Sequence, residues 1–208
     1  LTYNLSNTNA STQMQVGVVG ISNYNGNVSV ANTGGANGIY FNVNATASST
    51  LATTKTISLG AGGFTAGTLS LIRFTQLGST PQSLSQTTGT GILISGPTNI
   101  FNGDVTFNFP QLFLNGATYN GTATMQKNGA TDNTSLGGNI FNGVTSITNS
   151  SSANFLRLAN TNADNYNADV TFTQNNSGVL APNYNTNCTY AGNVTISAPT
   201  TYTITFGS

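Results

Sequence analysis

Short segments of alternating apolar and polar residues recur along the whole chain, and they share one pattern. Each segment has Gly or Ala, any residue, an apolar residue, Ser or Thr, and a second apolar residue, as in Gly103–Phe107. In an extended strand Val105 and Phe107 point to one side and Thr106 points to the other. The pattern therefore predicts short β-strands, each with one apolar side.

Seven copies of the pattern tolerate small departures, and an aromatic residue stands two or three positions before each of them. Asn-Gly often lies between the aromatic residue and the strand, and this pair favours a turn with positive φ. Each copy therefore predicts a turn followed by a strand. The copies span Gly26–Val30, Gly67–Leu71, Gly103–Phe107, Gly121–Met125, Gly143–Ile147, Ala168–Phe172 and Gly192–Ile196.

The intervals between the first residues of successive copies are 41, 36, 18, 22, 25 and 24 residues. The last four are close to 22, and each of the first two has room for two repeats. Residues 55–59 and 91–94 are candidates for degenerate copies within those two intervals. Repeats of this length, made of two or three short strands, predict the rungs of a β-solenoid, whose strands pair with the rungs above and below.

The predicted fold class is all-β, because no segment shows a 3.6-residue apolar period. A parallel β-solenoid (β-helix) with rungs of about 22 residues is the favoured architecture. One or two β-sandwiches are the alternative, since short strands at regular spacing fit both folds. We expect residues 1–95 to form an N-terminal β module with degenerate repeats, and residues 96–208 to form solenoid repeats.

Stacking the copies in register predicts two columns of side chains. The aromatic residues before the strands form a packing ladder: Tyr24, Phe101, Tyr119, Phe141, Tyr166 and Tyr190. The central Ser and Thr residues form an outward hydroxyl ladder: Ser29, Ser70, Thr106, Thr124, Ser146, Thr171 and Thr195. The hydroxyl ladder has a structural interpretation, because Thr favours strands and cross-strand pairs. A functional interpretation is contact with ice or with a glycan.

The composition excludes several classes of protein. Asn, Thr, Ser and Gly make up just over half of the 208 residues, and only 4% are charged. Net charge is zero without a Lys or Arg cluster, which argues against nucleic-acid binding. No apolar run approaches the roughly 18 residues of a membrane span.

Catalysis is the function that these residues support least. His and Glu are absent, which removes the commonest general base and the usual nucleophilic pairs. Asp104 and Asp169 share a motif position, but in a solenoid they lie about three rungs, roughly 14 Å, apart. We therefore predict no enzyme, no catalytic residues and no cofactor.

Two further features are weak candidates for chemistry. Oxygen ligands near Asp164 and Asp169 are a weak candidate for a Ca2+ site, without the spacing of an EF-hand loop. Cys188 is the single cysteine, so no disulfide forms within the chain, and its simplest interpretation is a small buried apolar residue.

The end of a solenoid exposes unpaired backbone groups and therefore needs a cap or a partner. Residues 200–206 form a strand-like run instead of a polar cap. The expected partners are other copies of this chain or adjoining repeats of a longer one, with a cell-surface glycan as a further candidate.

Three sequence segments resemble those of a known group of proteins. They are residues 139–147 (NIFNGVTSI), 157–164 (RLANTNAD) and 190–196 (YAGNVTI). They resemble the Asn/Thr/Gly-rich repeats of giant secreted surface proteins of Bacteroidota, and the resemblance covers roughly residues 97–208. In that group such chains are typically exported by the type IX pathway and serve as adhesins or appendages. The resemblance implies an extracellular or cell-surface bacterial location and supplies no catalytic residues.

The sequence therefore predicts a structural, non-catalytic subunit or segment of an extracellular fibre, appendage or adhesin stalk. Its rigidity would come from continuous hydrogen bonding between strands and from stacked Asn, Thr and aromatic side chains. The alternative is a glycan- or ice-binding β-solenoid module, which would act as a monomer through a flat hydroxyl or aromatic face.

Overall fold

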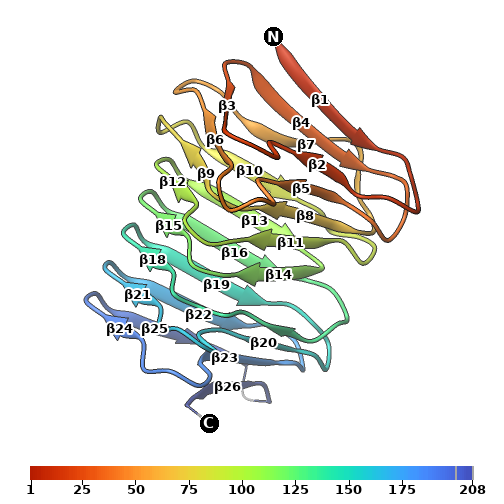
Figure 1. Ribbon diagram of the computed structural model, residues 1–208. Helices are drawn as coiled ribbons and strands as arrows, with labels where there is room; N and C mark the ends of the chain where they lie inside the picture. The colour runs from red at the N-terminus through yellow and green to blue at the C-terminus, as the bar shows by residue number, and fades with distance from the viewer. Residues whose placement is uncertain (200, 208) are drawn as a thin grey trace.

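The computed structural model describes residues 1–199 and 201–207 and contains only strands, turns and loops over these ranges. All paired strands are parallel, and the chain winds through about 8 turns of a β-solenoid with rungs about 24 residues apart. Figure 1 shows the strands stacked from the N-terminal to the C-terminal end. The predicted solenoid is confirmed, with rungs slightly longer than the expected 22 residues, and the β-sandwich alternative is wrong.

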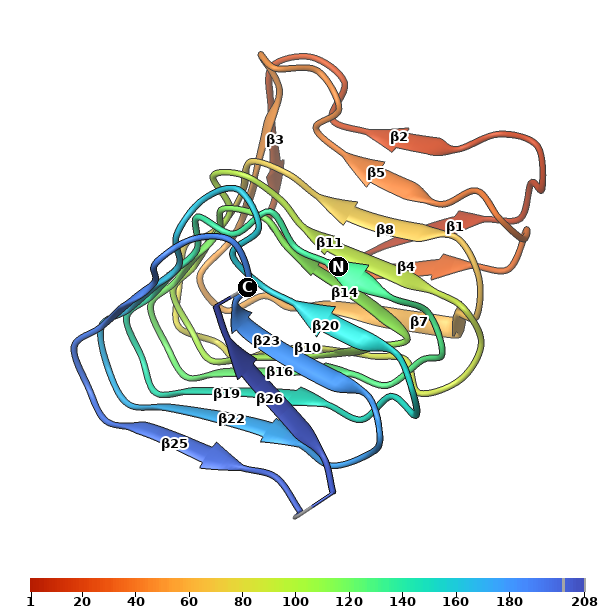
Figure 2. The ribbon, with the colours of Figure 1, turned by 90° about the horizontal axis from the view of Figure 1, so that it is seen from below.

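Every turn contributes one strand to each of three faces, which are visible together in the view along the stack (Figure 2). Face 1 consists of a three-stranded and a six-stranded sheet. Its strands are β1 (Thr2–Asn7), β4 (Asn27–Asn32), β7 (Ile57–Phe64), β10 (Gln82–Ser85), β13 (Val105–Phe109), β16 (Ala123–Lys127), β19 (Thr145–Asn149), β22 (Val170–Gln174) and β25 (Val194–Ser197).

Face 2 consists of a five-stranded and a four-stranded sheet. Its strands are β2 (Met14–Val16), β5 (Ile39–Phe41), β8 (Thr68–Leu71), β11 (Ile92–Ser95), β14 (Gln111–Leu114), β17 (Asn133–Thr134), β20 (Phe155–Arg157), β23 (Val179–Asn183) and β26 (Thr203–Phe206). The strand-like run expected at residues 200–206 therefore contains β26, while Thr200 lies outside the described residues.

Face 3 is one unbroken eight-stranded sheet of short strands. It consists of β3 (Ile21–Tyr24), β6 (Ser48–Leu51), β9 (Phe74–Gln76), β12 (Ile100–Phe101), β15 (Thr118–Tyr119), β18 (Ile140–Phe141), β21 (Asn165–Tyr166) and β24 (Thr189–Tyr190). Five of these strands have two residues each, and the aromatic residue is the second, as the sequence pattern predicted.

Side chains bridge the two places where a face is interrupted. Between β7 and β10, the side-chain oxygens of Gln82 and Gln86 accept hydrogen bonds from the backbone N–H groups of Ile57 and Phe64, at 2.7 and 2.9 Å. Between β14 and β17, the Ser135 hydroxyl accepts a bond from the Leu114 N–H at 3.0 Å. Buried backbone donors thus keep a partner where the strand ladder stops.

One apolar core runs through the interior, from Tyr24 near the N-terminal end to Leu180 near the C-terminal end. The pairing of β8 with β11 and of β11 with β14 carries the stack across residue 95. Residues 1–95 therefore share the solenoid with the rest of the chain, and the expected boundary at 95/96 falls at the end of β11.

Two expected repeat copies lie on a different face from the others. Gly67–Leu71 contains β8 and residues 91–94 contain most of β11, both of which belong to face 2. The face 1 strands of these turns are β7, which contains Ile57 to Leu59, and β10. The sequence pattern missed β10 because Thr80 stands where the other copies have Gly or Ala, and Gln82 stands where they have the first apolar residue.

Candidate functional site

The predicted packing ladder forms a column on the inner side of face 3. Neighbouring rings are stacked nearly parallel from Phe101 to Tyr190, with interplanar angles of 5 to 10°. The centroid distances are 5.6 Å for Phe101–Tyr119, 5.0 Å for Tyr119–Phe141, 4.9 Å for Phe141–Tyr166 and 5.1 Å for Tyr166–Tyr190. These distances match the spacing of rungs in a parallel sheet, about 4.8 Å, so the rings follow the backbone ladder.

Tyr24 belongs to the same column but not to the stack. The register pairs Tyr24 with Leu51 and Leu51 with Gln76, so two non-aromatic residues separate it from Phe101. Tyr24 instead contacts Phe41, which lies on face 2, edge to face at 6.1 Å and 67°. The structure thus brings together five of the six predicted ring positions.

Six of the seven predicted hydroxyl positions lie in one outward column on face 1. Strand register places Thr106, Thr124, Ser146, Thr171 and Thr195 directly next to each other on successive rungs. Ser29 lies in the same column further toward the N-terminal end, beside Asn4 and Ser58.

Ser70 is a correction, because it does not lie in this column. It belongs to β8 on face 2, where its register neighbours are Tyr40 and Ile94. The column contains Ser58 and Ser83 instead, which the repeat pattern did not identify as members. The segment with Pro81 and Gln82 before Ser83 does not match the repeat pattern. Only the alternation of Gln82, Ser83 and Leu84 indicates that the Ser83 side chain belongs to the outward column.

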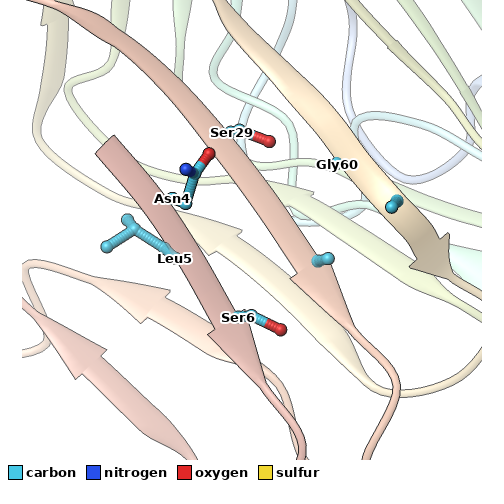
Figure 3. Close-up of a pocket in the computed structure, with 7 residues that line it drawn as sticks. Asn4, Leu5, Ser6, Ser29 and Gly60 are labelled. Atoms are coloured by element: carbon cyan, nitrogen blue, oxygen red, sulfur yellow. The ribbon is translucent and has the colours of Figure 1, made fainter. Parts of the chain in front are cut away.

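None of the column hydroxyls has a hydrogen-bond partner within residues 1–199 and 201–207. The distance between equivalent positions on adjacent strands, about 4.8 Å, is too long for a direct bond between hydroxyls. A shallow depression of about 230 Å³ opens where Ala31 and Gly60 replace larger outward residues on this face. Figure 3 shows Asn4, Ser6 and Ser29 around it, while Leu5 points the other way. This face therefore offers its hydroxyl groups to solvent or to a ligand.

Asparagine side chains behave differently at the corner between faces 3 and 1. Asn120 donates to Asn102, Asn142 donates to Asn120, and Asn167 donates to Asn142, each at 2.7 Å. An amide has both a donor and an acceptor, so each residue can serve the rung above and the rung below. This exposed asparagine ladder satisfies itself along the stack and is structural.

A second polar column lines the inner corner between faces 1 and 2. Its members donate hydrogen bonds from side-chain nitrogen atoms to carbonyl groups of the following turn. Lys127 is fully buried here, its Nζ donates to the Gly129 carbonyl at 2.6 Å, and burial lowers its pKa to about 8. The sequence pattern did not predict these polar positions, which share the column with Phe64 and Phe109 and are Asn7, Asn32, Gln86, Lys127, Asn149 and Gln174.

The acidic residues are dispersed along the stack. Asp104 and Asp169 lie in exposed corners three rungs apart, and each accepts a hydrogen bond at 2.8 Å from a backbone N–H of the next rung, Thr122 or Asn193. Asp164 is fully buried, unlike Asp169. The described residues contain no group of three His, Cys, Asp or Glu side chains that could hold a metal ion.

Asp164 occupies a position where the preceding rung has an asparagine, Asn139. Its Oδ1 accepts bonds from the backbone N–H and the side-chain amide of Asn139, both at 2.8 Å. Its Oδ2 is buried with no hydrogen-bond partner among the described residues. Burial raises the pKa of this carboxyl to about 6, although the bonds from Asn139 oppose the shift.

Cys188 lies one rung beyond Asp164 and is half-buried. Its Sγ is 3.7 Å from the Pro182 carbonyl oxygen, and burial raises the pKa of the thiol to about 11. A raised pKa keeps the sulfur protonated and weakly nucleophilic at neutral pH.

Comparisons with protein-family models, with curated proteins and with solved structures found no match to this chain. The described residues form no helix that is long and apolar enough to cross a membrane.

Proposed function

We propose that this chain is a structural, non-catalytic segment of an extracellular fibre, appendage or adhesin stalk. The observation that carries the proposal is the stack of rings from Phe101 to Tyr190, in step with the backbone ladder of face 3. Hydrogen bonds and ring contacts both run along the long axis. A pull along that axis must break many of them together, which suits a part that transmits force.

The surface chemistry supports the same role. With four cationic and four anionic residues, copies or neighbouring repeats have little charge to repel one another. Contacts that depend on few charges also depend little on salt. Location outside a bacterial cell is part of the proposal and rests on the resemblance to surface-protein repeats of Bacteroidota.

The proposed contacts between rungs of different repeats or copies use the edges of the first and last turns. At the C-terminal end, Val194 and Ile196 are exposed although their register neighbours Val170 and Phe172 are buried, and Phe206 is exposed beside the half-buried Asn183. At the N-terminal end, Tyr3 and Leu5 are only partly buried and β1 has one unpaired edge. An unpaired edge with apolar neighbours favours addition of another strand.

Cryo-electron microscopy of the protein at high concentration tests this proposal. We expect rods that lengthen by end-to-end contact, with an axial repeat near 4.8 Å. Ile196→Lys places a charge on the inner side of the terminal edge, where an added rung would bury it, and should shorten the rods because an unpaired buried charge is costly. Thr195→Lys, one residue away on the outer side, is the matched control. Discrete particles without ordered contacts, for the unchanged protein, would refute end-to-end assembly.

The second candidate function is an ice- or glycan-binding module, and the unpartnered hydroxyl column on face 1 favours it. A flat, uncharged face with hydroxyl groups at regular intervals can order water or meet a repeating sugar chain. Inhibition of ice recrystallisation by the monomer is the direct test. Activity should fall when Thr124 and Thr171 are both replaced by Lys, and a monomer without activity would refute the ice-binding form of this candidate.

A further inference from the structure

Arg157 is placed unlike the other arginine of the chain. Arg73 donates hydrogen bonds to the backbone carbonyls of Asn42, Asn44 and Ala47, so its guanidinium has internal partners. Arg157 has no hydrogen bond or ion pair from its guanidinium to any residue within 1–199 or 201–207. It lies on the outer side of face 2, at the end of β20.

Two aromatic rings contact the Arg157 guanidinium. Its Cζ lies 3.5 Å from the ring centroid of Phe155 and 4.4 Å from that of Tyr184. Such contacts use the faces of the guanidinium plane. The guanidinium N–H groups have no acceptor within the described part of the protein.

A depression of about 170 Å³ lies beside this guanidinium. It forms because Ala181, the register neighbour of Arg157 on the next rung, is small. Val179 and the Tyr184 ring add apolar surface, and Thr205 adds a hydroxyl group. The depression therefore combines one fixed cation, an apolar floor, an aromatic wall and one hydroxyl.

We infer that this depression binds the carboxylate of an acidic sugar, such as a uronic acid residue of a polysaccharide. The planar carboxylate matches the edge of a guanidinium, which can donate two parallel hydrogen bonds. The C–H face of a sugar ring fits against Val179, Ala181 and Tyr184, and Thr205 can bond a ring hydroxyl. A single cation suits one carboxylate, whereas phosphate backbones are bound by several cations.

The inference goes beyond the structural role and does not rest on it, because the depression is complete within one chain. It gives a ligand class to the glycan-binding candidate and places the ligand on face 2, away from the hydroxyl column. A failure of end-to-end assembly in the imaging experiment would leave this binding unchanged.

Titration with trigalacturonate, followed by NMR chemical shifts, tests the inference. We expect roughly millimolar binding, typical of one charged contact, with shifts centred on Arg157, Val179 and Ala181. Arg157→Gln should weaken binding at least tenfold, and Arg157→Lys should weaken it less. Lys55→Gln removes the same charge at a distant place and is the matched control. Unchanged melting temperatures show that the variants are folded.

Two ligand controls separate the sugar from its charge. The methyl ester of trigalacturonate keeps the sugar rings and loses the carboxylates, so it should bind at least tenfold more weakly. Triglutamate keeps the carboxylates and loses the sugar rings, and it should also bind more weakly. Equal binding of the methyl ester would overturn the role of Arg157. Equal binding of triglutamate would assign the depression to a peptide partner, and no binding of trigalacturonate would overturn the inference outright.

Discussion

Two regions of the solenoid share the same three-strand plan but fill their interior differently. They are the N-terminal rungs, from β1 to β9, and the C-terminal rungs, from β13 to β24. In the C-terminal rungs, successive rings on face 3 stack at 4.9 to 5.1 Å. In the N-terminal rungs, Tyr24, Phe41 and Phe74 meet edge to face across two faces, at 6.1 and 5.9 Å. An aromatic residue at the same register position in successive rungs thus produces a ladder, whereas Leu51 and Gln76 at that position leave a mixed core.

The length of the rungs also differs between the two regions. The step from β13 to β16 takes 18 residues and that from β16 to β19 takes 22, whereas the step from β4 to β7 takes 29 and the register shifts within that pair. Longer turns need additional polar support, which Arg73 provides through the carbonyls of Asn42, Asn44 and Ala47. This long N-terminal turn is therefore held by a charged side chain, whereas the C-terminal rungs carry the continuous stack of rings.

Removal of one ring from the stack should give the largest effect. Phe141→Ala leaves a cavity between Tyr119 and Tyr166, and we expect a loss of about 3–5 kcal/mol in the free energy of unfolding. Tyr24→Ala is the comparison in the N-terminal rungs and should cost less, because Tyr24 is 8% exposed, Phe141 is fully buried, and Tyr24 lies outside the stack. Urea denaturation measures both, and equal losses would refute a special role for stacking.

Asp164 is the irregular position within the regular C-terminal rungs, and it predicts a dependence of stability on pH. The pKa of this carboxyl is about 6 in the folded chain and 3.8 as its ordinary value. The folded state therefore binds more protons between these values, and stability falls as pH rises from about 4 to 6 by up to about 3 kcal/mol. Above that window the loss is complete.

Asp164→Asn should abolish this pH dependence and stabilise the protein at pH 7. Asparagine suits the position because Asn139 occupies it on the preceding rung. Asp169→Asn removes the same charge from an exposed corner and controls for net charge. Thermal denaturation from pH 4 to 8 measures the effect, and a stability of Asp164→Asn that still falls from pH 4 to 6 would contradict the explanation.

Loss of Arg73 should weaken the N-terminal rungs without disturbing the C-terminal ones. Arg73→Met removes the charged donors of the long turn, and we expect a cost of about 2 kcal/mol, since bonds from charged groups contribute about 1.5–3 kcal/mol each and these are partly exposed. Hydrogen exchange should become faster in β3 and β6 but not in β18 and β21. Arg157→Met, which removes an arginine without internal hydrogen bonds, should leave exchange in both regions unchanged.

The same contrast explains how much could be predicted from the sequence. Positions such as Val105, Phe107 and Phe141 recur every 18 to 25 residues in the same local pattern, so the solenoid and the ring ladder could be recognised from them. Ser70 was assigned to the wrong column because Gly67–Leu71 imitates a face 1 repeat while β8 belongs to face 2. A local motif specifies a strand, and the intervening loop length decides which face that strand joins.

The polar interior was harder to predict for a related reason. Lys127 and Asn149 have no special sequence context, and only the strand register shows that they are neighbours in one corner column. Arg157 and Tyr184 are 27 residues apart in the sequence, so the guanidinium site depends on two turns of the solenoid. Such sites arise from stacking, which single strands do not reveal.

The smallest predicted effect separates the two outward ladders of the C-terminal rungs. Asn142 bonds to Asn120 and Asn167 at 2.7 Å, whereas the Thr124 hydroxyl has no partner among the described residues. Asn142→Ala should therefore lower the free energy of unfolding by about 1 kcal/mol. Thr124→Ala should lower it by only about a few tenths of a kcal/mol, which reflect the strand preference of Thr. Urea denaturation resolves this difference if both variants are measured together. Equal costs would mean that hydrogen bonds between exposed side-chain amides along the stack stabilise the fold no more than hydrogen bonds to water do. The rigidity of the C-terminal rungs would then rest on the inner rings and the backbone alone.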